Sequence, residues 1–220
     1  MNRVQQNKST NIPFEIELND NVADERFIAD GMTEFERNVK RAGDFLLAIF
    51  GLIVFSPLFA TCYLLVKRED KGPAIFKQER IGRFGKPFYI YKFRSMVTNA
   101  EDLIKQFTPE QKAEYERNFK LENDPRVTKV GKFMRRTSLD ELPQLFNILK
   151  GDISIVGLRP VMEVETEIYG NYRDMLLSVK PGLTGFWAAN GRSCTTYTRR
   201  RAMEIYYIKN RSVCFDLKII

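Results

Sequence analysis

Histidine is absent from all 220 residues of this chain. That absence excludes catalytic pairs in which histidine activates a serine or cysteine, and it excludes histidine-ligated zinc. Cys62, Cys194 and Cys214 have no C-x-x-C spacing, so neither a metal cluster nor a disulfide framework is indicated, which is typical of a reducing compartment. The phosphate-binding loops G-x-x-x-x-G-K-[ST] and G-x-G-x-x-G are also missing. Any chemistry must therefore use carboxylates, lysines, arginines or a hard metal ion.

Acidic residues are scarce relative to basic ones once the first 36 residues are passed. Residues 1–36 hold eight acidic and three basic residues, a net charge of −5, so residues 37–220 carry +12 of the total of +7. We interpret 1–36 as a polar acidic N-terminal extension, with a short helix within 21–36. The basic body favours an anionic partner such as a lipid phosphate or a nucleotide. No nucleic-acid-binding module is recognised, so we expect no nucleic-acid partner.

The sequence has one long apolar run, residues 45–66, in which 22 consecutive residues carry no charge. Its length suits a membrane segment. Lys and Arg flank the run at both ends, and by the positive-inside rule each end is therefore expected on the cytoplasmic side of the membrane. Ser56 and Pro57 lie at its middle, where proline bends a helix. We therefore predict a re-entrant helix hairpin over 37–68, broken at Ser56 and Pro57; the alternative is a spanning helix with a kink. The run begins too far along the chain for a cleaved signal peptide.

The remaining chain, 69–220, is predicted to form a cytoplasmic domain of the α+β class, mostly helical and membrane-associated. Two β-prone runs around a glycine-containing turn predict a small β-hairpin at 74–80 and 87–93. A short apolar strand is expected at 153–156, and 180–185 is interpreted as a loop. Helices are predicted at 99–120, with a break at Thr108 and Pro109, from Pro143 to Gly151, at 163–178 and at 197–209. A further helix at 127–136 is predicted to be basic and amphipathic, which suits a membrane interface.

Two adjacent carboxylates, Asp140 and Glu141, are the candidate chemical centre. One interpretation is structural, because Ser138 and Glu141 match the capping box S-x-x-E of a helix start. The other is a carboxylate pair beside Arg135 and Arg136, which suits phosphoryl chemistry, since a carboxylate can attack phosphorus and a divalent metal would offset the charge repulsion. Further phosphate-binding candidates are Arg159, in a turn after the predicted strand, and Lys92 and Arg94 at the end of the hairpin. The arginines at 199–201 are interpreted as a solvated or lipid-facing stripe.

Four segments in order carry a resemblance to a known family: KRAGDFLLAIFGLIVFSP, IFKQERIGRFGKPFYIYKFRSM, DPRVTKVGKFMRRTSLDELPQLFNILKGDISIVGLRP and KPGLTGFW. Over about residues 37–220 the chain resembles the bacterial sugar transferases, the small-type monotopic polyprenyl-phosphate phosphoglycosyl transferases. It departs from the family at Leu158, where proline is usual, and at Ala188 and Ala189, where Gln-Val is more familiar.

The resemblance implies transfer of a sugar 1-phosphate from a UDP-sugar donor to undecaprenyl phosphate, with release of UMP, to initiate capsule, exopolysaccharide, O-antigen or glycan synthesis. It implies that Asp140 is the nucleophile that forms a covalent phosphosugar intermediate and binds Mg²⁺, and that Glu141 supports it. The remaining family positions are substrate-binding residues: Lys92, Arg135, Arg159, Gln78, Arg80 and Arg192. The family is monotopic in the inner membrane, with the catalytic domain facing the cytoplasm and in contact with membrane lipid, and a homodimer is compatible with it.

Two other classes were weighed against this one. A membrane-docked anion-binding module without catalysis would tolerate replacement of Asp140 but not loss of its basic residues. A phosphodiesterase using carboxylates and a metal would release sugar phosphate without a lipid acceptor. The ordered motifs favour the transferase.

Overall fold

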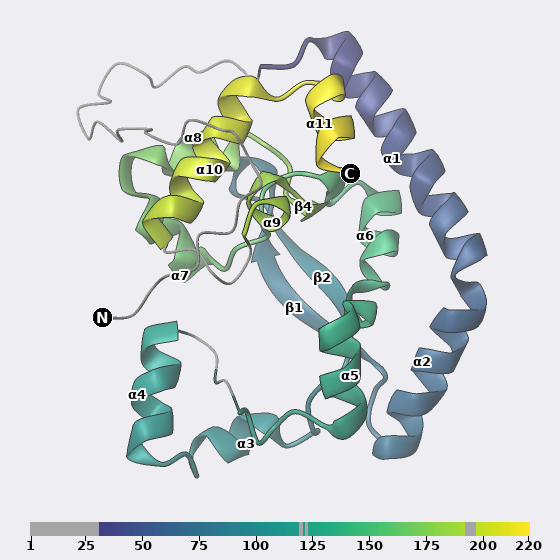
Figure 1. Cartoon of the computed structure of the whole chain (residues 1–220), viewed down its shortest axis with the longest axis vertical. Helices are drawn as coiled ribbons and strands as arrows, with labels where there is room; N and C mark the ends of the chain where they lie inside the picture. The colour runs from purple at the N-terminus through teal and green to yellow at the C-terminus, as the bar shows by residue number, and fades with distance from the viewer. Residues whose placement is uncertain (1–30, 119–120, 122, 192–196) are drawn as a thin grey trace, which may run out of the picture.

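The computed structural model describes residues 31–118, 121, 123–191 and 197–220. Two consecutive helices, α1 (Glu34–Val54) and α2 (Ser56–Glu69), form an arc along one flank of the molecule, and the remaining elements lie on its inner side (Figure 1). The mixture of helices with a small antiparallel hairpin confirms the α+β class. The predicted membrane association of these helices stays a prediction.

The break between α1 and α2 lies where it was predicted. The two helices meet at Phe55 with a bend of 65°. Pro57 has no N–H to donate to the Ile53 carbonyl, and the Ser56 hydroxyl donates to that oxygen instead, at 2.8 Å. Within the described residues no single helix is long and apolar enough to cross a bilayer, whereas this bent pair is by length and composition.

The start of α1 differs from the predicted boundary at residue 37. Thr33 and Glu36 form a capping box, with the Glu36 amide donating to the Thr33 hydroxyl at 3.2 Å and the Thr33 amide donating to the Glu36 carboxylate at 2.9 Å. The helix therefore begins at Glu34, inside the segment predicted as an extension. The rest of the predicted 21–36 helix, 21–30, lies outside the described residues.

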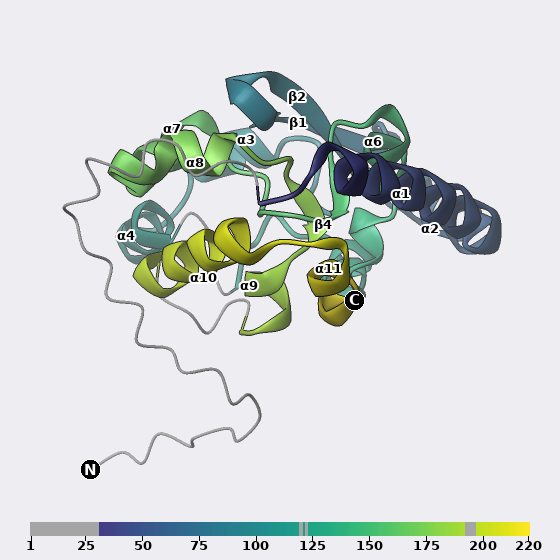
Figure 2. The ribbon, with the colours of Figure 1, turned by 90° about the horizontal axis from the view of Figure 1, so that it is seen from above.

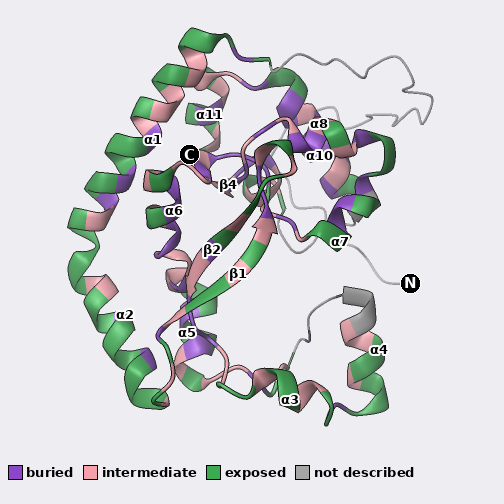
Figure 3. Cartoon of the chain, turned by 180° about the vertical axis from the view of Figure 1, so that it is seen from behind, coloured by how far each residue is buried: buried purple, intermediate pink, exposed green. Residues whose placement is uncertain are grey.

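One face of α1 is fixed to the body of the protein. Asp44, Ala48 and Gly51 are buried at helical spacing. The Asp44 carboxylate accepts hydrogen bonds from the Ser154 hydroxyl at 2.7 Å and the Ile155 amide at 3.0 Å. The opposite surface of the arc is apolar and exposed, including Phe45, Leu46, Leu47, Phe50, Ile53, Val54, Phe55, Tyr63, Leu64 and Leu65 (Figure 3).

The predicted hairpin is confirmed as β1 (Ile75–Ile81) and β2 (Pro87–Phe93), an antiparallel pair joined by the short 3₁₀ turn η1 (Arg83–Gly85). The outer edge of β2 is covered by α6 (Gln144–Lys150), whose Asn147 side chain accepts from the Tyr91 amide at 3.0 Å and donates to the Tyr89 carbonyl at 2.7 Å. Covering an edge in this way satisfies backbone groups that would otherwise be open to pairing.

Two short helices, α3 (Ala100–Ile104) and α4 (Pro109–Asn118), follow the hairpin and confirm the break predicted at Thr108 and Pro109. Thr108 caps α4 by accepting from the Gln111 amide at 3.3 Å. Residues 119 and 120 of the predicted segment lie outside the described residues. Next come α5 (Lys129–Thr137), the 3₁₀ turn η2 (Leu139–Glu141) and α6, which ends at Gly151 as predicted.

A second, two-stranded sheet corrects one expectation. The predicted strand is β3 (Ser154–Val156), and it pairs in parallel with β4 (Gly182–Thr184), which lies in the segment interpreted as a loop. The backbones approach so closely that a Cβ built on Gly182 would lie 2.2 Å from the Gly157 nitrogen, and one on Gly185 would lie 2.0 Å from the Gly157 oxygen. Glycines at this contact lower the local β propensity, which is why the pattern indicated a loop.

The predicted helix at 163–178 is instead three short pieces, α7 (Glu163–Thr166), η3 (Glu167–Tyr172) and α8 (Arg173–Leu177). Gly170 interrupts them with φ 50° and ψ −125°, a conformation that glycine adopts without steric cost. The chain then forms α9 (Phe186–Ala189), α10 (Tyr197–Asn210), close to its predicted range, and α11 (Val213–Ile219). Figure 2 shows α10 and α11 on the side of the body opposite the hairpin.

Candidate active site

The two adjacent carboxylates lie on η2, between α5 and α6. Ser138 ends α5 in the left-handed conformation, with φ 59°, and so redirects the chain into η2. The Ser138 side chain makes no capping hydrogen bond to η2, and its carbonyl instead accepts from the Glu141 amide at 3.2 Å. The capping-box interpretation is therefore wrong, because the Glu141 side chain is bound elsewhere.

Lys92, near the end of β2, binds that side chain. Its Nζ lies 2.9 Å from Glu141 Oε1, and both side chains remain about a third exposed (29% and 36%). Arg135 on α5 donates from Nε to the Ser95 hydroxyl at 2.8 Å. The hairpin and α5 therefore both lie against η2, and they are linked by contacts between residues 49 and 40 positions apart in sequence. The roles predicted for Lys92 and Arg135 stay predictions.

Asp140 differs from Glu141 in being buried, with 9% of its surface exposed. Burial raises the pKa of the Asp140 carboxyl above its ordinary value, and the negative charge of Glu141 adds to that rise, while Lys92 and Arg135 lower it. Burial in turn lowers the pKa of Arg135, which the Asp140 charge opposes. The buried carboxylate is therefore weakly solvated and lies within electrostatic range of two cations, an arrangement that suits a nucleophile toward a phosphate group.

One face of the β-hairpin extends from this carboxylate site. Lys92 is opposite Phe76, Gln78 is opposite Ile90, and Arg80 is opposite Phe88. Directly opposed residues share a face, as do residues two apart on one strand, so Lys92, Gln78 and Arg80 lie on the same face. The four residue steps from Phe76 to Arg80 correspond to about 13 Å along the strand.

Gln78 and Arg80 make contacts within the protein at the far end of this face. Arg80 donates to Gln78 Oε1 at 2.7 Å and lies 3.0 Å from the Glu165 carboxylate on α7. Burial lowers the pKa of Arg80, and the positive charges of Arg159 and Arg200 act in the same direction, so these three arginines lie close enough to interact. Their predicted contact with a nucleotide or sugar stays a prediction.

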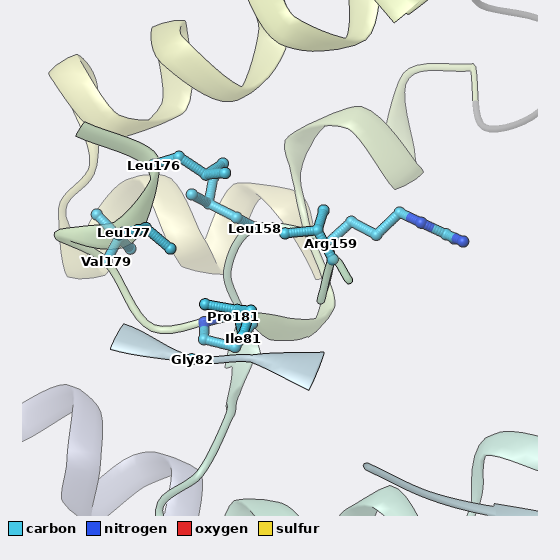
Figure 4. A pocket seen from close by; sticks show the side chains of 9 residues that line it. Ile81, Gly82, Leu158, Arg159, Leu176, Leu177, Val179 and Pro181 are labelled. Atoms are coloured by element: carbon cyan, nitrogen blue, oxygen red, sulfur yellow. The ribbon is translucent and has the colours of Figure 1, made fainter. Parts of the chain in front are cut away.

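Arg159 lies beside Trp187, with its guanidinium carbon 5.6 Å from the ring centroid, and Arg200 lies 5.0 Å from the same ring. The Arg159 side chain is exposed and points away from the small apolar hollow, of ≈ 10 Å³, that its backbone helps to line (Figure 4). Glu204 accepts from Arg200 Nε at 3.3 Å and from the Arg159 amide at 3.4 Å. An exposed guanidinium with a fixed backbone and an aromatic neighbour suits recognition of a phosphate.

The arginine cluster at 199–201 was interpreted as solvated or lipid-facing, and this is wrong for Arg200, which is 6% exposed and pairs with Glu204. The spacing of Arg200 and Glu204, four residues apart on a helix, is a signal that sequence reasoning could have used. Glu165 and Ser95 carry no comparable signal, since their partners are distant in sequence. Arg192 lies outside the described residues.

Within the described residues, no group of three or more histidine, cysteine, aspartate or glutamate side chains is arranged to hold a metal. Magnesium sites commonly use only one or two protein carboxylates together with substrate phosphates. A single carboxylate such as Asp140 is therefore compatible with Mg²⁺ held jointly with a phosphorylated substrate, and the magnesium site stays a prediction.

Comparisons with known proteins show the family to which the chain belongs. The sequence profile of the bacterial sugar transferase family matches residues 35–220. The chain is 47% identical, over 84% of its length, to an undecaprenyl-phosphate galactose phosphotransferase of Salmonella typhimurium, and 42% identical, also over 84%, to a UDP-glucose:undecaprenyl-phosphate glucose-1-phosphate transferase of Escherichia coli. It covers only 39% of each of those relatives, but 81% of the exopolysaccharide production protein ExoY of Sinorhizobium fredii, with 44% identity over 82% of this chain. The chain belongs to the bacterial sugar transferase family.

Proposed function

We propose that this protein transfers a sugar 1-phosphate from a UDP-sugar to undecaprenyl phosphate, and so initiates synthesis of a membrane-bound glycoconjugate. The observation that carries the proposal is the buried Asp140 carboxylate, next to the ion pair of Glu141 with Lys92 and within electrostatic range of Arg135. The names of the Salmonella and Escherichia relatives support the two substrates, and that of the ExoY relative supports a role in exopolysaccharide production.

In the proposed first step, an Asp140 carboxylate oxygen attacks the phosphorus that bears the sugar. A bond forms between that oxygen and phosphorus, and the bond from phosphorus to the bridging oxygen breaks, so UMP leaves with the electron pair. In the second step a phosphate oxygen of undecaprenyl phosphate attacks the same phosphorus. The bond to Asp140 breaks, and the carboxylate is regenerated with a diphosphate-linked sugar as product.

The neighbouring residues position and neutralise the reacting groups. The ion pair between Lys92 and Glu141 holds the lysine ammonium beside the carboxylate that reacts, and Arg135 adds a second positive charge. Mg²⁺ held by Asp140 and the donor diphosphate would offset repulsion between the carboxylate and the phosphates. A nucleophile held in line with the phosphorus reacts much faster than the same group free in solution. Effective molarities of well-oriented groups reach about 10⁵ M or more.

The donor is proposed to lie along the hairpin face. Its diphosphate would lie near Lys92, and its far end near Gln78, Arg80 and Arg159, with Arg192 as a further contact. The face is about 13 Å long, which is of the order of a nucleotide diphosphate. Two observations support this placement. Lys92, Gln78 and Arg80 lie on the same face of the hairpin, and the guanidinium of Arg159 is exposed.

The same function explains the apolar arc of α1 and α2. We propose that it enters the cytoplasmic leaflet of the inner membrane and returns, which leaves the catalytic domain on the cytoplasmic side. The 65° bend and the basic residues at both ends of the arc support this topology over a straight span. A lipid acceptor whose phosphate lies at the interface would then meet Asp140 without leaving the bilayer.

The test is release of UMP from a panel of UDP-sugars with Mg²⁺, with and without undecaprenyl phosphate. We expect lipid-dependent release with at least one sugar, and loss of at least about a thousandfold in the Asp140→Asn variant, because removal of a covalent nucleophile has effects of that size or more. Asp102→Asn is the matched control, since Asp102 is 70% exposed on α3. Transfer retained by Asp140→Asn would refute the nucleophile, and sugar phosphate formed without lipid would indicate the phosphodiesterase instead.

A further inference from the structure

The outward face of α5 carries three cations around one aromatic ring. Lys129, Lys132 and Arg136 are spaced three and four residues apart, and Phe133 between them is 48% exposed. These four residues line a surface hollow of ≈ 290 Å³. We propose that this hollow binds the phosphate headgroup of an anionic membrane phospholipid; the inference rests on the membrane attachment proposed above.

The opposite face of the helix determines which residues point outward. Gly131 and Met134 are buried, and a Cβ built on Gly131 would lie 2.0 Å from the Ser95 carbonyl oxygen. This contact requires glycine and leaves α5 little freedom to rotate. The predicted apolar stripe of this helix therefore faces the protein interior, apart from Phe133, and the basic side faces outward. The predicted contact of this helix with a membrane interface stays a prediction.

The three cations form no ion pair within the described residues. In the part of the chain that the structure describes, no carboxylate pairs with Lys129, Lys132 or Arg136, whereas Arg126, shortly before the helix, is paired with Asp124 at 2.6 Å. Like charges three or four residues apart on a helix repel one another. An anion bound among them would remove that repulsion and form charge-assisted hydrogen bonds.

The position of α5 indicates where that anion comes from. The Val130 amide donates to Glu69 Oε1, at 3.1 Å, and Glu69 is the last residue of α2. The hollow therefore lies beside the end of the apolar arc, where Lys67 and Arg68 are also exposed, and Figure 1 shows α5 next to the end of α2. Basic residues at the border of a membrane segment lie at the depth of the lipid phosphates.

The aromatic ring favours a lipid over a soluble phosphate. Phe133 is 48% exposed and lines the hollow together with the three cations. A lipid headgroup offers both a phosphate for the cations and, just below it, glycerol and acyl carbons for the ring. A free phosphate ion offers only the first.

The experiment compares partition of the full chain from detergent micelles into phosphatidylcholine vesicles with and without phosphatidylglycerol, at low and high salt. Each cation near an anionic surface strengthens binding about fivefold, so the triple variant Lys129→Ala, Lys132→Ala and Arg136→Ala should lose the preference for phosphatidylglycerol by about 100-fold. A matched control, Lys86→Ala, Lys112→Ala and Lys218→Ala, changes the net charge equally at three other exposed sites and should keep the preference.

Equal losses in the two triple variants would show a general charge effect and overturn the proposal, as would an unchanged preference in the α5 variant. Partition into pure phosphatidylcholine separates this proposal from the proposed membrane attachment. If the wild-type chain binds neutral vesicles, the arc attaches to membranes whatever the outcome at α5. If it binds neither kind of vesicle, membrane attachment and the headgroup site both fail.

Discussion

Replacement of Asp44 by alanine should loosen α1 from the body of the protein. Asp44 is 7% exposed, and its two oxygens accept from the Ser154 hydroxyl at 2.7 Å and the Ile155 amide at 3.0 Å. Hydrogen bonds to a charged group contribute about 1.5–3 kcal/mol each, and buried donors left without an acceptor cost a similar amount. We therefore expect Asp44→Ala to lower the free energy of unfolding by about 3 kcal/mol or more. Asp44→Asn, which keeps one acceptor without the charge, should lose about half of that.

The assay is urea unfolding in detergent, followed by the fluorescence of Trp187, the only tryptophan in the chain. The matched control is Asp102→Ala, because Asp102 is 70% exposed and its ion pair with Lys105 is 3.0 Å long. Such exposed pairs contribute about 0.5 kcal/mol or less. An Asp44→Ala protein that unfolds within about 0.5 kcal/mol of the wild type would refute the argument that this carboxylate holds α1 in place.

Two further predictions concern the carboxylate site and the membrane arc. The positive charge of Lys92 lowers the pKa of Asp140, so Lys92→Ala should raise it further and move the acid limb of the pH profile of kcat/KM to higher pH; an unmoved limb would contradict the proposed role of ionised Asp140. Single cysteines at Glu34 and Lys71, in a chain whose own cysteines are replaced, should both escape an impermeant thiol reagent on intact cells and both react after lysis. Reaction of one of them from outside would indicate a spanning helix instead.

Features governed by local sequence could be predicted. The helix break follows from Pro57 alone, and the hairpin follows from two β-prone runs and a glycine-containing turn. The end of α6 at Gly151 follows from the need for a left-handed residue, with φ 86°. Each of these depends on a few residues close together in the chain, so a single sequence carries the signal.

Features governed by contacts between residues distant in sequence could not be predicted. β4 exists because Gly157, Gly182 and Gly185 allow two backbones to approach, which no periodicity reveals. Ser138 and Glu141 match a capping box by spacing, but Lys92 from the hairpin takes the Glu141 side chain instead. The resemblance to a family predicts Lys92 and Arg135 as site residues, whereas the contacts that position them are visible only in the fold.

The end of strand β2 has a larger role in the carboxylate site than its length suggests. Lys92 binds Glu141, and Ser95, just beyond the strand, both accepts a hydrogen bond from Arg135 and lies against Gly131 of α5. The orientation of α5, and through it the turn that carries Asp140, therefore depends on one short stretch of backbone.

The same hairpin extends to Arg80, which pairs with Glu165 on α7 and lies within electrostatic range of Arg159. The two groups of predicted site residues are thus joined by a rigid antiparallel ladder rather than by a loop. If the proposed donor binds at both groups, a ladder fixes the distance between its two ends. A hinge at this position would instead increase the entropy lost on binding, because the two groups would have to be ordered relative to each other each time.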